Sequence, residues 1–589
     1  MNTLAFNINK AIAITGACAL ITTLGLSGCT QTLPGKGADL VLLNGKIDTQ
    51  NSDSPWASAI AINGKRISYV GENQYAQTLI GQNTIVIDLD GQVVLPGFID
   101  THAHPVMAAG MSDGLQLSLD AQPDELLATI DDYVKDNPHT QGIIGFGFSA
   151  AVFGLQGPNK ELLDAIEPNR PVILVDEGGH SAWVNSKALE LAGIDRNTPD
   201  PVPGTHYFQR DSDGNPTGWC LEAMTFFPMI AKLQLVDTQK IITGSSDLFA
   251  LFSAFGITTV YDAGFSSFAD TAYEAVDQLA KEDKLPFRLV TSHMIQSPAH
   301  LVDAIDKLSA YQQRYSSELV MPRVMKIHND GTKEARTAGQ FEAYADNPDN
   351  FGSLLLEGKL LYDFVQDVDK AGFDIHIHAI GDKAVHEALN AFEQAKAANP
   401  DSSNRYSIAH TELVIDKDLT RFAANNVIAQ TTPYWFEPHG EAALGKERAN
   451  KLFRFRQILD SGAKVTFGSD FPATGSLIGL SPIINMEMGQ TRRFPQSDKT
   501  SSAGPQKTLT LEEMIRGYTI DAAYQLNMET DIGSLEQGKL ADLVVINKNV
   551  FELDEDQIHT AKVAMTMMNG EIVYQRNWKS YLVEWALDL

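Results

Sequence analysis

The middle of the chain alternates short apolar segments with amphipathic helices, and this alternation limits the fold more than any other feature. Helix signals are clearest at residues 382–398 and 510–526, where Thr510 and Glu513 form a capping box. Strands that alternate with helices in this way predict parallel βα units. The apolar segments have the length of buried strands and occupy residues 143–148, 172–175, 258–261, 288–290, 324–327, 373–377, 407–409, 427–430 and 465–467.

Together with a further segment at 97–101, these strands outnumber the eight of a (β/α)8 barrel. We therefore predict an α/β fold with a TIM-like barrel over residues 96–525 and an insertion within about 105–250. The chain of 589 residues is long enough for such a barrel and a second domain. Its apolar content of 43% excludes a disordered chain.

Both ends of the chain have an all-β character instead. Residues 38–95 and 541–574 contain short strand-like segments separated by turn dipeptides. We predict that residues 38–95 and 526–589 form one β-sandwich, with the barrel inserted between them. The dipeptides are typical of two-residue hairpins and lie at Asn44-Gly45, Asn63-Gly64, Asp90-Gly91 and Asn569-Gly570.

Residues 1–28 have the features of an export signal. Lys10 precedes an uncharged apolar run, which is followed by Leu26-Ser27-Gly28-Cys29. This sequence resembles the lipobox of bacterial lipoproteins, which implies a lipid on Cys29 and attachment to a bacterial membrane. Thr30 in the next position favours the outer membrane, and residues 29–37 would form a tether. An ordinary secretory signal or an anchor helix is the alternative.

Charge and cysteine content exclude two further properties. The chain has 45 Lys+Arg against 74 Asp+Glu, a net charge of −29, and no basic cluster stands out. Nucleic acid is therefore excluded as a partner, because phosphate binding needs clustered cations. Cys18 lies in the signal and Cys29 would be acylated, so Cys220 is left without a disulfide partner. We expect Cys220 to be a small buried apolar residue.

Polar side chains stand at the carboxyl ends of several predicted strands. His102 and His104 are two residues apart, so both imidazoles project from one face of a strand. A lone strand histidine is more often structural, but barrel enzymes build their active sites where these strand ends converge. Four histidines, a carboxylate and a lysine there predict a metal site. The remaining members of the set are Lys326, His378, His410 and Asp470.

Six segments together resemble the amidohydrolase superfamily, in particular its amidohydrolase-3 branch, which includes N-substituted formamide deformylases. The resemblance extends from about residue 38 to 574, which is nearly the whole mature chain. The opening barrel strand and the returning sandwich segment are matched by PGFIDTHAH at 96–104 and IGSLEQGKLADL at 532–543. The branch is indicated by HSAWVNSKAL at 180–189, DGT at 330–332, HAIGD at 378–382 and GSDFP at 468–472.

The resemblance implies a centre for divalent metal, usually zinc. Asp470 would accept the proton of a water that attacks a polarised carbonyl. A lysine carbamate would be an anionic oxygen ligand, whereas a free ammonium repels a dication. The alternative is a mononuclear site with an unmodified lysine. The implied ligands are His102, His104 and Asp470 for one ion, His378 and His410 for a second, and Lys326, as a carbamate formed with CO2, between them.

The resemblance also places His180 and Trp183 near the substrate. His180 would bind the substrate or polarise its carbonyl, and a structural role at a helix start is the alternative. Arg336 is either a clamp for a substrate anion or a partner in a structural ion pair. Thr411-Glu412 and residues 430–433 depart from the family pattern on the substrate side, so the substrate stays open. His376 is interpreted as a packing or supporting residue, and no role is assigned to His328, Glu437 and His439.

We therefore predict a metal-dependent hydrolase that cleaves a C–N bond of a small amide-like molecule. Two alternatives remain. One is a non-catalytic lipoprotein that binds a ligand in the barrel mouth, and the other is a metal-dependent isomerase or lyase on the same fold. The oligomeric state is left open, with a homodimer as one option.

Overall fold

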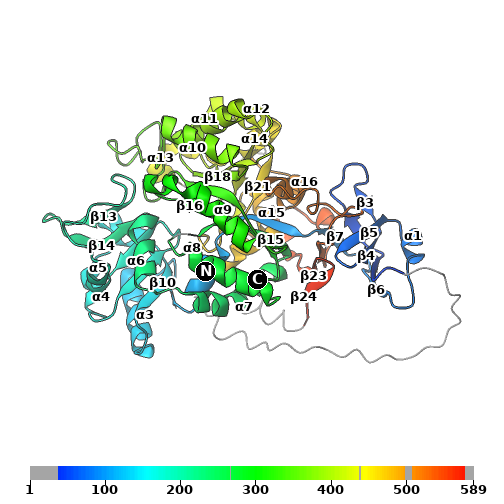
Figure 1. Cartoon of the computed structure of the whole chain (residues 1–589), viewed down its shortest axis with the longest axis horizontal. Coiled ribbons are helices and arrows are strands. Elements are labelled where there is room, and N and C mark those ends of the chain that lie inside the picture. The colour runs from blue at the N-terminus through cyan, green and yellow to red at the C-terminus, as the bar shows by residue number, and fades with distance from the viewer. Residues whose placement is uncertain (1–36, 266, 437–439, 498–506, 578–589) are drawn as a thin grey trace.

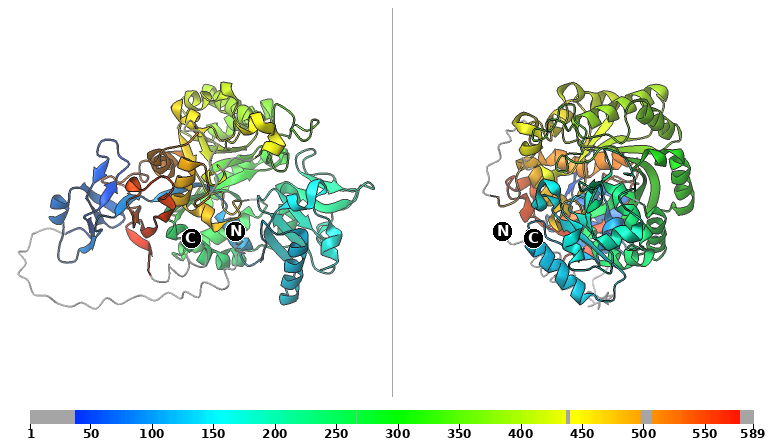
Figure 2. Two further views of the ribbon diagram at one scale, coloured as in Figure 1. Left: turned by 180° about the vertical axis from the view of Figure 1, so that it is seen from behind. Right: turned by 90° about the vertical axis from the view of Figure 1, so that its left-hand side faces the viewer.

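The computed structural model describes residues 37–577, apart from residue 266 and residues 437–439 and 498–506. A β-sandwich, a barrel and an inserted α/β unit follow one another along the longest axis, with the barrel in the middle (Figures 1 and 2). None of the helices in this described part is long and apolar enough to cross a membrane. The predicted signal and Cys29 lie outside the described residues.

The barrel consists of eight parallel strands in sequence order, each paired with the next. It closes between its first and last strands, where the Thr101 hydroxyl donates to the Phe467 carbonyl oxygen at 2.8 Å. The predicted (β/α)8 barrel is therefore confirmed. Its strands are β8 (Phe98–Ala103), β15 (Ile257–Phe265), β16 (Arg288–Ile295), β17 (Val320–His328), β18 (Asp374–Ala379), β19 (Tyr406–His410), β20 (Val427–Thr431) and β21 (Val465–Phe467).

Helices connect the barrel strands and cover the outside of the barrel (Figure 1). The helix predicted at 382–398 is present, but the one predicted at 510–526 is two helices that meet at Thr519, whose φ and ψ are −130° and −98°. The Thr519 hydroxyl donates back to the Ile515 carbonyl at 2.6 Å, which competes with continuation of the helix. These helices are α2 (Pro105–Met111), α7 (Thr238–Ala254), α8 (Ala269–Lys281), α9 (Ala304–Tyr315), α10 (Gly358–Lys370), α11 (Asp382–Ala398), α12 (Arg421–Asn425), α13 (Glu441–Ala449), α14 (Phe455–Asp460), α15 (Pro482–Thr491), α16 (Leu511–Tyr518) and α17 (Ile520–Gln525).

The insertion lies between β8 and β15 and has a mixed sheet of its own. The strands predicted at 143–148 and 172–175 belong to this sheet, which explains the excess over eight. The sheet order is β13-β14-β12-β11-β10-β9. The strands are β9 (Leu115–Gln116), β10 (Ile143–Phe148), β11 (Val172–Asp176), β12 (Ser181–Val184), β13 (Tyr207–Arg210) and β14 (Pro216–Leu221), and the helices are α3 (Pro123–Asp136), α4 (Lys160–Asp164), α5 (Ser186–Ala192) and α6 (Phe227–Lys232).

The sandwich is built from both chain ends, because β22 from the C-terminal part pairs antiparallel with β7 from the N-terminal part. Side chains of its two sheets share one apolar core, which includes Leu42, Ile60, Val94 and Leu543. One sheet contains β1 (Leu40–Leu43), β4 (Ala59–Asn63), β5 (Arg66–Gly71) and β6 (Ile85–Asp88), with α1 (Asn73–Gln77) beside it. The other contains β2 (Lys46–Asp48), β3 (Trp56–Ala57), β7 (Val93–Pro96), β22 (Leu543–Ile546), β23 (Val563–Met568) and β24 (Glu571–Gln575).

Two of the four predicted hairpin turns have a different role. Asn63-Gly64 and Asn569-Gly570 each connect paired antiparallel strands, as expected. Asn44-Gly45 and Asp90-Gly91 instead lead the chain from one sheet of the sandwich to the other. The hairpin prediction was wrong there because a positive φ, which Asn44 and Asp90 both adopt, suits a crossing between sheets as well as a tight turn.

Candidate metal centre

All six predicted ligands line one cavity at the carboxyl end of the barrel. The insertion forms part of its wall, since Phe146, His180 and Phe227 line the same cavity. Five of the barrel strands, or the turns that follow them, provide these residues. His102 lies on β8 and His104 directly after it, and the others are Lys326 on β17, His378 on β18, His410 at the end of β19 and Asp470 three residues after β21.

Asp470 lies beside both histidines of the first strand. Its Oδ1 atom is 3.5 Å from His102 Nε2 and 3.4 Å from His104 Nε2. One ligand atom of each of the three residues lies within 4.8 Å of the others, a spacing suitable for a shared metal ion. Burial raises the pKa of Asp470, but its hydrogen bond with His104 and the nearby basic groups outweigh burial and lower it. The carboxylate is therefore ionised at neutral pH.

Two of the ligands have an uncommon backbone conformation. His410 and Asp470 have φ values of 67° and 48°, in the left-handed region that residues with a side chain rarely adopt. The Asp470 amide donates to the His102 carbonyl at 2.7 Å, which holds the turn after β21 against the first strand. Such conformations persist where the surrounding structure enforces them and are concentrated at functional sites.

A second group of histidines lines the same cavity. The rings of His378 and His410 are 4.4 Å apart between centroids. One ligand atom each of His180, His328 and His378 also lies within 4.8 Å of the others. Sequence reasoning assigned His328 no role. It could have been found, because it is two residues after Lys326 on β17 and so lies on the same face of the strand.

Four buried nitrogens in this cavity have no hydrogen-bond partner among the described residues: Lys326 Nζ, His328 Nδ1, His378 Nε2 and His410 Nδ1. Buried polar groups are nearly always paired, so an unpaired set that converges on one cavity indicates a ligand that completes it. Imidazole nitrogens beside a carboxylate are the donors that zinc-like divalent cations prefer. The residues present therefore fit a divalent metal.

Burial keeps the nitrogen ligands in their uncharged form. It lowers the pKa of His102 and His378 well below the usual value and that of His410 to about 3. Neutral imidazole is the form that binds a metal. Burial also lowers the pKa of Lys326 to about 7, so an appreciable fraction of the amine is neutral near pH 7. A neutral amine is the form that can add CO2.

Hydrogen bonds behind the ligands fix their orientation. His102 Nδ1 lies 2.9 Å from His376 Nε2, and His376 Nδ1 lies 2.6 Å from the Ser407 hydroxyl. His376 thus has a supporting place behind a ligand. His378 Nδ1 lies 2.9 Å from Asp330 Oδ1, which leaves the Nε2 atom of His378 toward the cavity. Partners of this kind orient metal-binding histidines in many proteins.

His180 is held by a buried carboxylate from the insertion. Its Nδ1 lies 2.8 Å from Glu222 Oε2, and the Thr337 hydroxyl donates to the other oxygen at 2.7 Å. Burial lowers the pKa of His180, but the charge of Glu222 outweighs it and raises the pKa to about 9. His180 is therefore an imidazolium at neutral pH and lines the cavity as a donor. Nothing in the sequence near Glu222 indicated this pairing.

Comparison with known proteins decides the family. Residues 85–574 match the amidohydrolase family. The chain belongs to this family. This amidohydrolase is a metal-dependent hydrolase on a TIM-like barrel, and the cavity above is where the candidate metal ligands converge.

Three proteins are similar to this amidohydrolase over most of its length. Protein LONG AFTER FAR-RED 3 of Arabidopsis thaliana is 30% identical over 91% of this chain and 92% of its own length. The N-substituted formamide deformylase of Arthrobacter pascens is 26% identical over 91% of this chain and 98% of its own. The crystal structure of an uncharacterized metal-dependent hydrolase from Pyrococcus furiosus has a TM-score of 0.65 and 25% identity, covering 87% of this chain and 99% of that one.

Two residues expected near the substrate lie elsewhere in this amidohydrolase. Trp183 is fully buried in the insertion core, where its indole donates to the Asn159 carbonyl at 2.9 Å and its ring packs against Phe148. Arg336 forms an ion pair with Asp346, with 3.1 Å between Nε and Oδ2, and so has the structural role of its two interpretations. Neither lines the cavity, because each side chain is already engaged where its element packs.

The departure at Thr411-Glu412 also has a structural explanation. Glu412 forms a buried ion pair with Lys333, with 2.5 Å between Oε2 and Nζ. The carboxylate is therefore compensated rather than offered to a substrate. Glu437 and His439 lie outside the described residues.

Proposed function

We propose that the protein hydrolyses a C–N bond of a small amide-like molecule. The observation that carries this proposal is the ionised Asp470 carboxylate beside His102 and His104, in a cavity where four buried nitrogens have no hydrogen-bond partner among the described residues. A residue placed in this way can ligate a metal and accept a proton from water. These are the two tasks that metal-assisted hydrolysis asks of a carboxylate.

The metal we propose is zinc, with two ions per chain. His102, His104 and Asp470 would hold one ion. The second would be held by His378 and His410. Lys326 would bridge the two as a carbamate, formed when its neutral amine adds CO2 and releases one proton. Lys326 lies near both histidine groups, since its charge acts on His102 and on His378. Its Nζ has no partner in the described structure, and both features support this arrangement.

The chain's own residues supply the acid–base chemistry. The metal, when bound, polarises a carbonyl and lowers the pKa of water. Asp470 accepts the proton of the attacking water at a carboxylate oxygen and delivers it to the leaving nitrogen when the C–N bond breaks. His180, held protonated by Glu222, donates a hydrogen bond to the substrate oxygen as negative charge develops there.

Asp470→Asn tests this function, because the amide keeps the shape of the carboxylate but not its basicity. Hydrolysis of any amide that the wild type cleaves should fall by about 10²- to 10⁴-fold. Circular dichroism should show an unchanged fold, and metal analysis should separate lost base catalysis from lost metal. Asp90→Asn is the matched control, since Asp90 is exposed in the sandwich. A wild-type rate for Asp470→Asn would overturn the proposal.

We also propose that the chain is exported and anchored to a bacterial membrane, on the outer-membrane side, by a lipid on Cys29. The lipobox-like sequence at 26–29 supports this location. Cys29→Ala should release the protein from the membrane fraction or block its processing. An unchanged distribution and electrophoretic mobility of this variant would contradict the anchor.

A further inference from the structure

An uncharged, exposed segment lies at the end of the sandwich where the described chain begins. Figures 1 and 2 show α1 and β6 at this end, farthest from the insertion along the longest axis. The sequence from Asn73 to Ile87 contains α1, the turn after it and most of β6, and it has no Asp, Glu, Lys or Arg. Ala76 is the only buried residue of the segment. We call residues 73–87 the sandwich tip.

Apolar side chains are exposed on both sides of the edge strand of the sandwich tip. β6 is the last strand in the order β5-β4-β1-β6, so one of its backbone edges has no neighbouring strand among the described residues. Ile85 and Val86 are 61% and 45% exposed, and as consecutive strand residues they point to opposite faces. Tyr75 on α1 is 56% exposed. Proteins usually charge or cover such an edge, so an apolar edge without either indicates a partner.

The chain enters the sandwich at the sandwich tip, because the Ala38 amide donates to the Leu79 carbonyl at 2.8 Å. The proposed lipid on Cys29 is eight residues before Gly37, so the connection between them cannot exceed about 29 Å. A compact chain of 589 residues has a radius of gyration of about 25 Å and is therefore wider than this connection is long. A lipid on Cys29 would thus hold the sandwich tip, rather than the insertion, next to the bilayer.

The charge of the chain also selects the face that can lie on a membrane. A bilayer that contains anionic lipid repels a chain of net charge −29, so a face without carboxylates approaches it most easily. The acidic residues that border the sandwich tip, Asp39, Glu72 and Asp88, each accept a hydrogen bond from another sandwich residue. The sandwich tip can therefore lose contact with water without burying an ionised group of its own.

We propose that the sandwich tip is a membrane-contact surface, which lies on the bilayer that holds the lipid of Cys29. This proposal rests on the proposed anchor and adds the orientation of the molecule. Ile85 and Val86 enter the boundary between head groups and acyl chains, where interfacial apolar side chains lie. The amino end of the barrel joins the sandwich through Arg288, and the metal cavity lies at the other end with the insertion. The cavity thus faces the aqueous phase, away from the membrane.

Hydrogen–deuterium exchange tests the contact without altering the surface. A chain that starts at Cys29 would be coupled through this thiol to a maleimide phospholipid in phosphatidylcholine vesicles, since Cys220 is buried and does not compete. Residues 73–87 should exchange at least about fivefold more slowly than in soluble Cys29→Ala protein. Residues 186–192 of the insertion, where Leu191 is 43% exposed, are the reference and should exchange equally in both proteins.

Three results of this measurement would overturn the proposal. One is equal exchange of residues 73–87 in the coupled and the soluble protein. Another is protection of residues 186–192 by the vesicles, which would contradict the orientation. The third is slow exchange of residues 73–87 already in the soluble protein at the same concentration, which would assign the sandwich tip to a contact between two copies of the chain.

A charged variant tests the side chains themselves. The double variant Ile85→Asp and Val86→Asp, coupled in the same way, should lose at least about two thirds of the protection, because carboxylates resist leaving water. Replacement of both residues by threonine, which keeps the β-branched shape, serves if the Asp variant does not fold, and protection should fall at least about twofold. Leu191→Asp is the matched control and should keep it. Unchanged protection in the folded double variants would contradict the contact, whereas absent acylation of Cys29 in cells, with protection of the coupled protein intact, would sink the proposed anchor alone.

Discussion

Each end of the barrel buries a basic side chain, and the two lie on neighbouring strands. One of them is paired with a carboxylate, whereas the other has no hydrogen-bond partner among the described residues. Arg288 begins β16 at the amino end and donates to Asp542 and Asn569 of the sandwich, with 3.1 Å between Nη2 and Asp542 Oδ1. Lys326 lies on β17 toward the carboxyl end, and its Nζ has no hydrogen-bond partner within the described chain. Both side chains are almost fully buried, at 2% and 1% exposure.

The difference separates a structural charge from a functional one. A buried cation with a full set of partners fixes two domains against each other, as Arg288 fixes the barrel to the sandwich. A buried amine without partners is unfavourable unless a ligand completes it, and the neighbouring nitrogens of His378 and His410 are in the same state. The amino end of the barrel is thus built for stability and the carboxyl end for binding.

The largest expected effect on stability comes from removing the paired cation at the amino end of the barrel. Arg288→Met should lower the free energy of unfolding by about 3–5 kcal/mol, because it leaves the Asp542 carboxylate buried without its cation. Lys326→Met is the matched variant and should change it by less than about 1 kcal/mol, since no partner is lost. Chemical denaturation of the metal-stripped proteins measures both. Equal losses in the two variants would contradict the distinction between the ends.

A smaller effect is expected from the His180–Glu222 pair at the carboxyl end. The pKa of His180, raised to about 9 by Glu222, lies above the usual 6.5, so the stability from this pair is complete below pH 6.5 and lost as the pH rises through about 9. The alkaline limb of the rate profile should lie near the same pH. Glu222→Gln removes the charge, and the limb should move down by at least about one pH unit. An unmoved limb would mean that another group titrates there.

The barrel and most of its ligands could be predicted because they follow from local patterns. Strand length, helix period and the polar residue at each strand end are all readable along the chain, which is how His102, His378 and Asp470 were found. His102 on β8 and His104 directly after it are two residues apart, and this spacing equals the side-chain period of a strand. These features need no knowledge of distant contacts.

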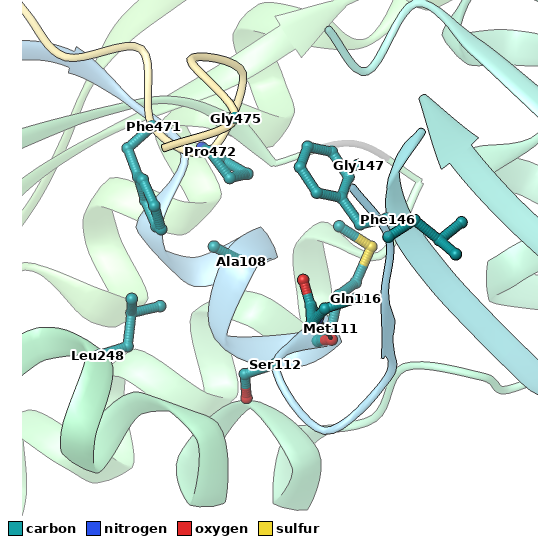
Figure 3. A pocket seen from close by; sticks show the side chains of 11 residues that line it. Ala108, Met111, Ser112, Gln116, Phe146, Gly147, Leu248, Phe471, Pro472 and Gly475 are labelled. Atoms are coloured by element: carbon teal, nitrogen blue, oxygen red, sulfur yellow. Dashed lines mark hydrogen bonds between the residues drawn. The ribbon is translucent and has the colours of Figure 1, made fainter. Parts of the chain in front are cut away.

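The rest depends on contacts between distant segments. Glu222 lies 42 residues from His180, and the Arg288–Asp542 pair spans 254 residues. Trp183 carries a polar group and was expected at the substrate, but its indole is satisfied by a carbonyl inside the insertion. The apolar pocket lined by residues 108–117, β10, α7 and the loop after β21 likewise exists only where these four segments meet (Figure 3). Such pairings leave no periodic mark in the sequence.

Zinc content tests the central claim most directly. Wild type, Lys326→Met and Arg288→Met would be stripped with a chelator, reconstituted with zinc and bicarbonate, desalted and analysed for bound metal. We expect about two zinc ions per chain in the wild type and in folded Arg288→Met, and at most about one in Lys326→Met. Lys326→Met with the metal content of the wild type would contradict the claim that the unpartnered amine at the carboxyl end serves the metal centre.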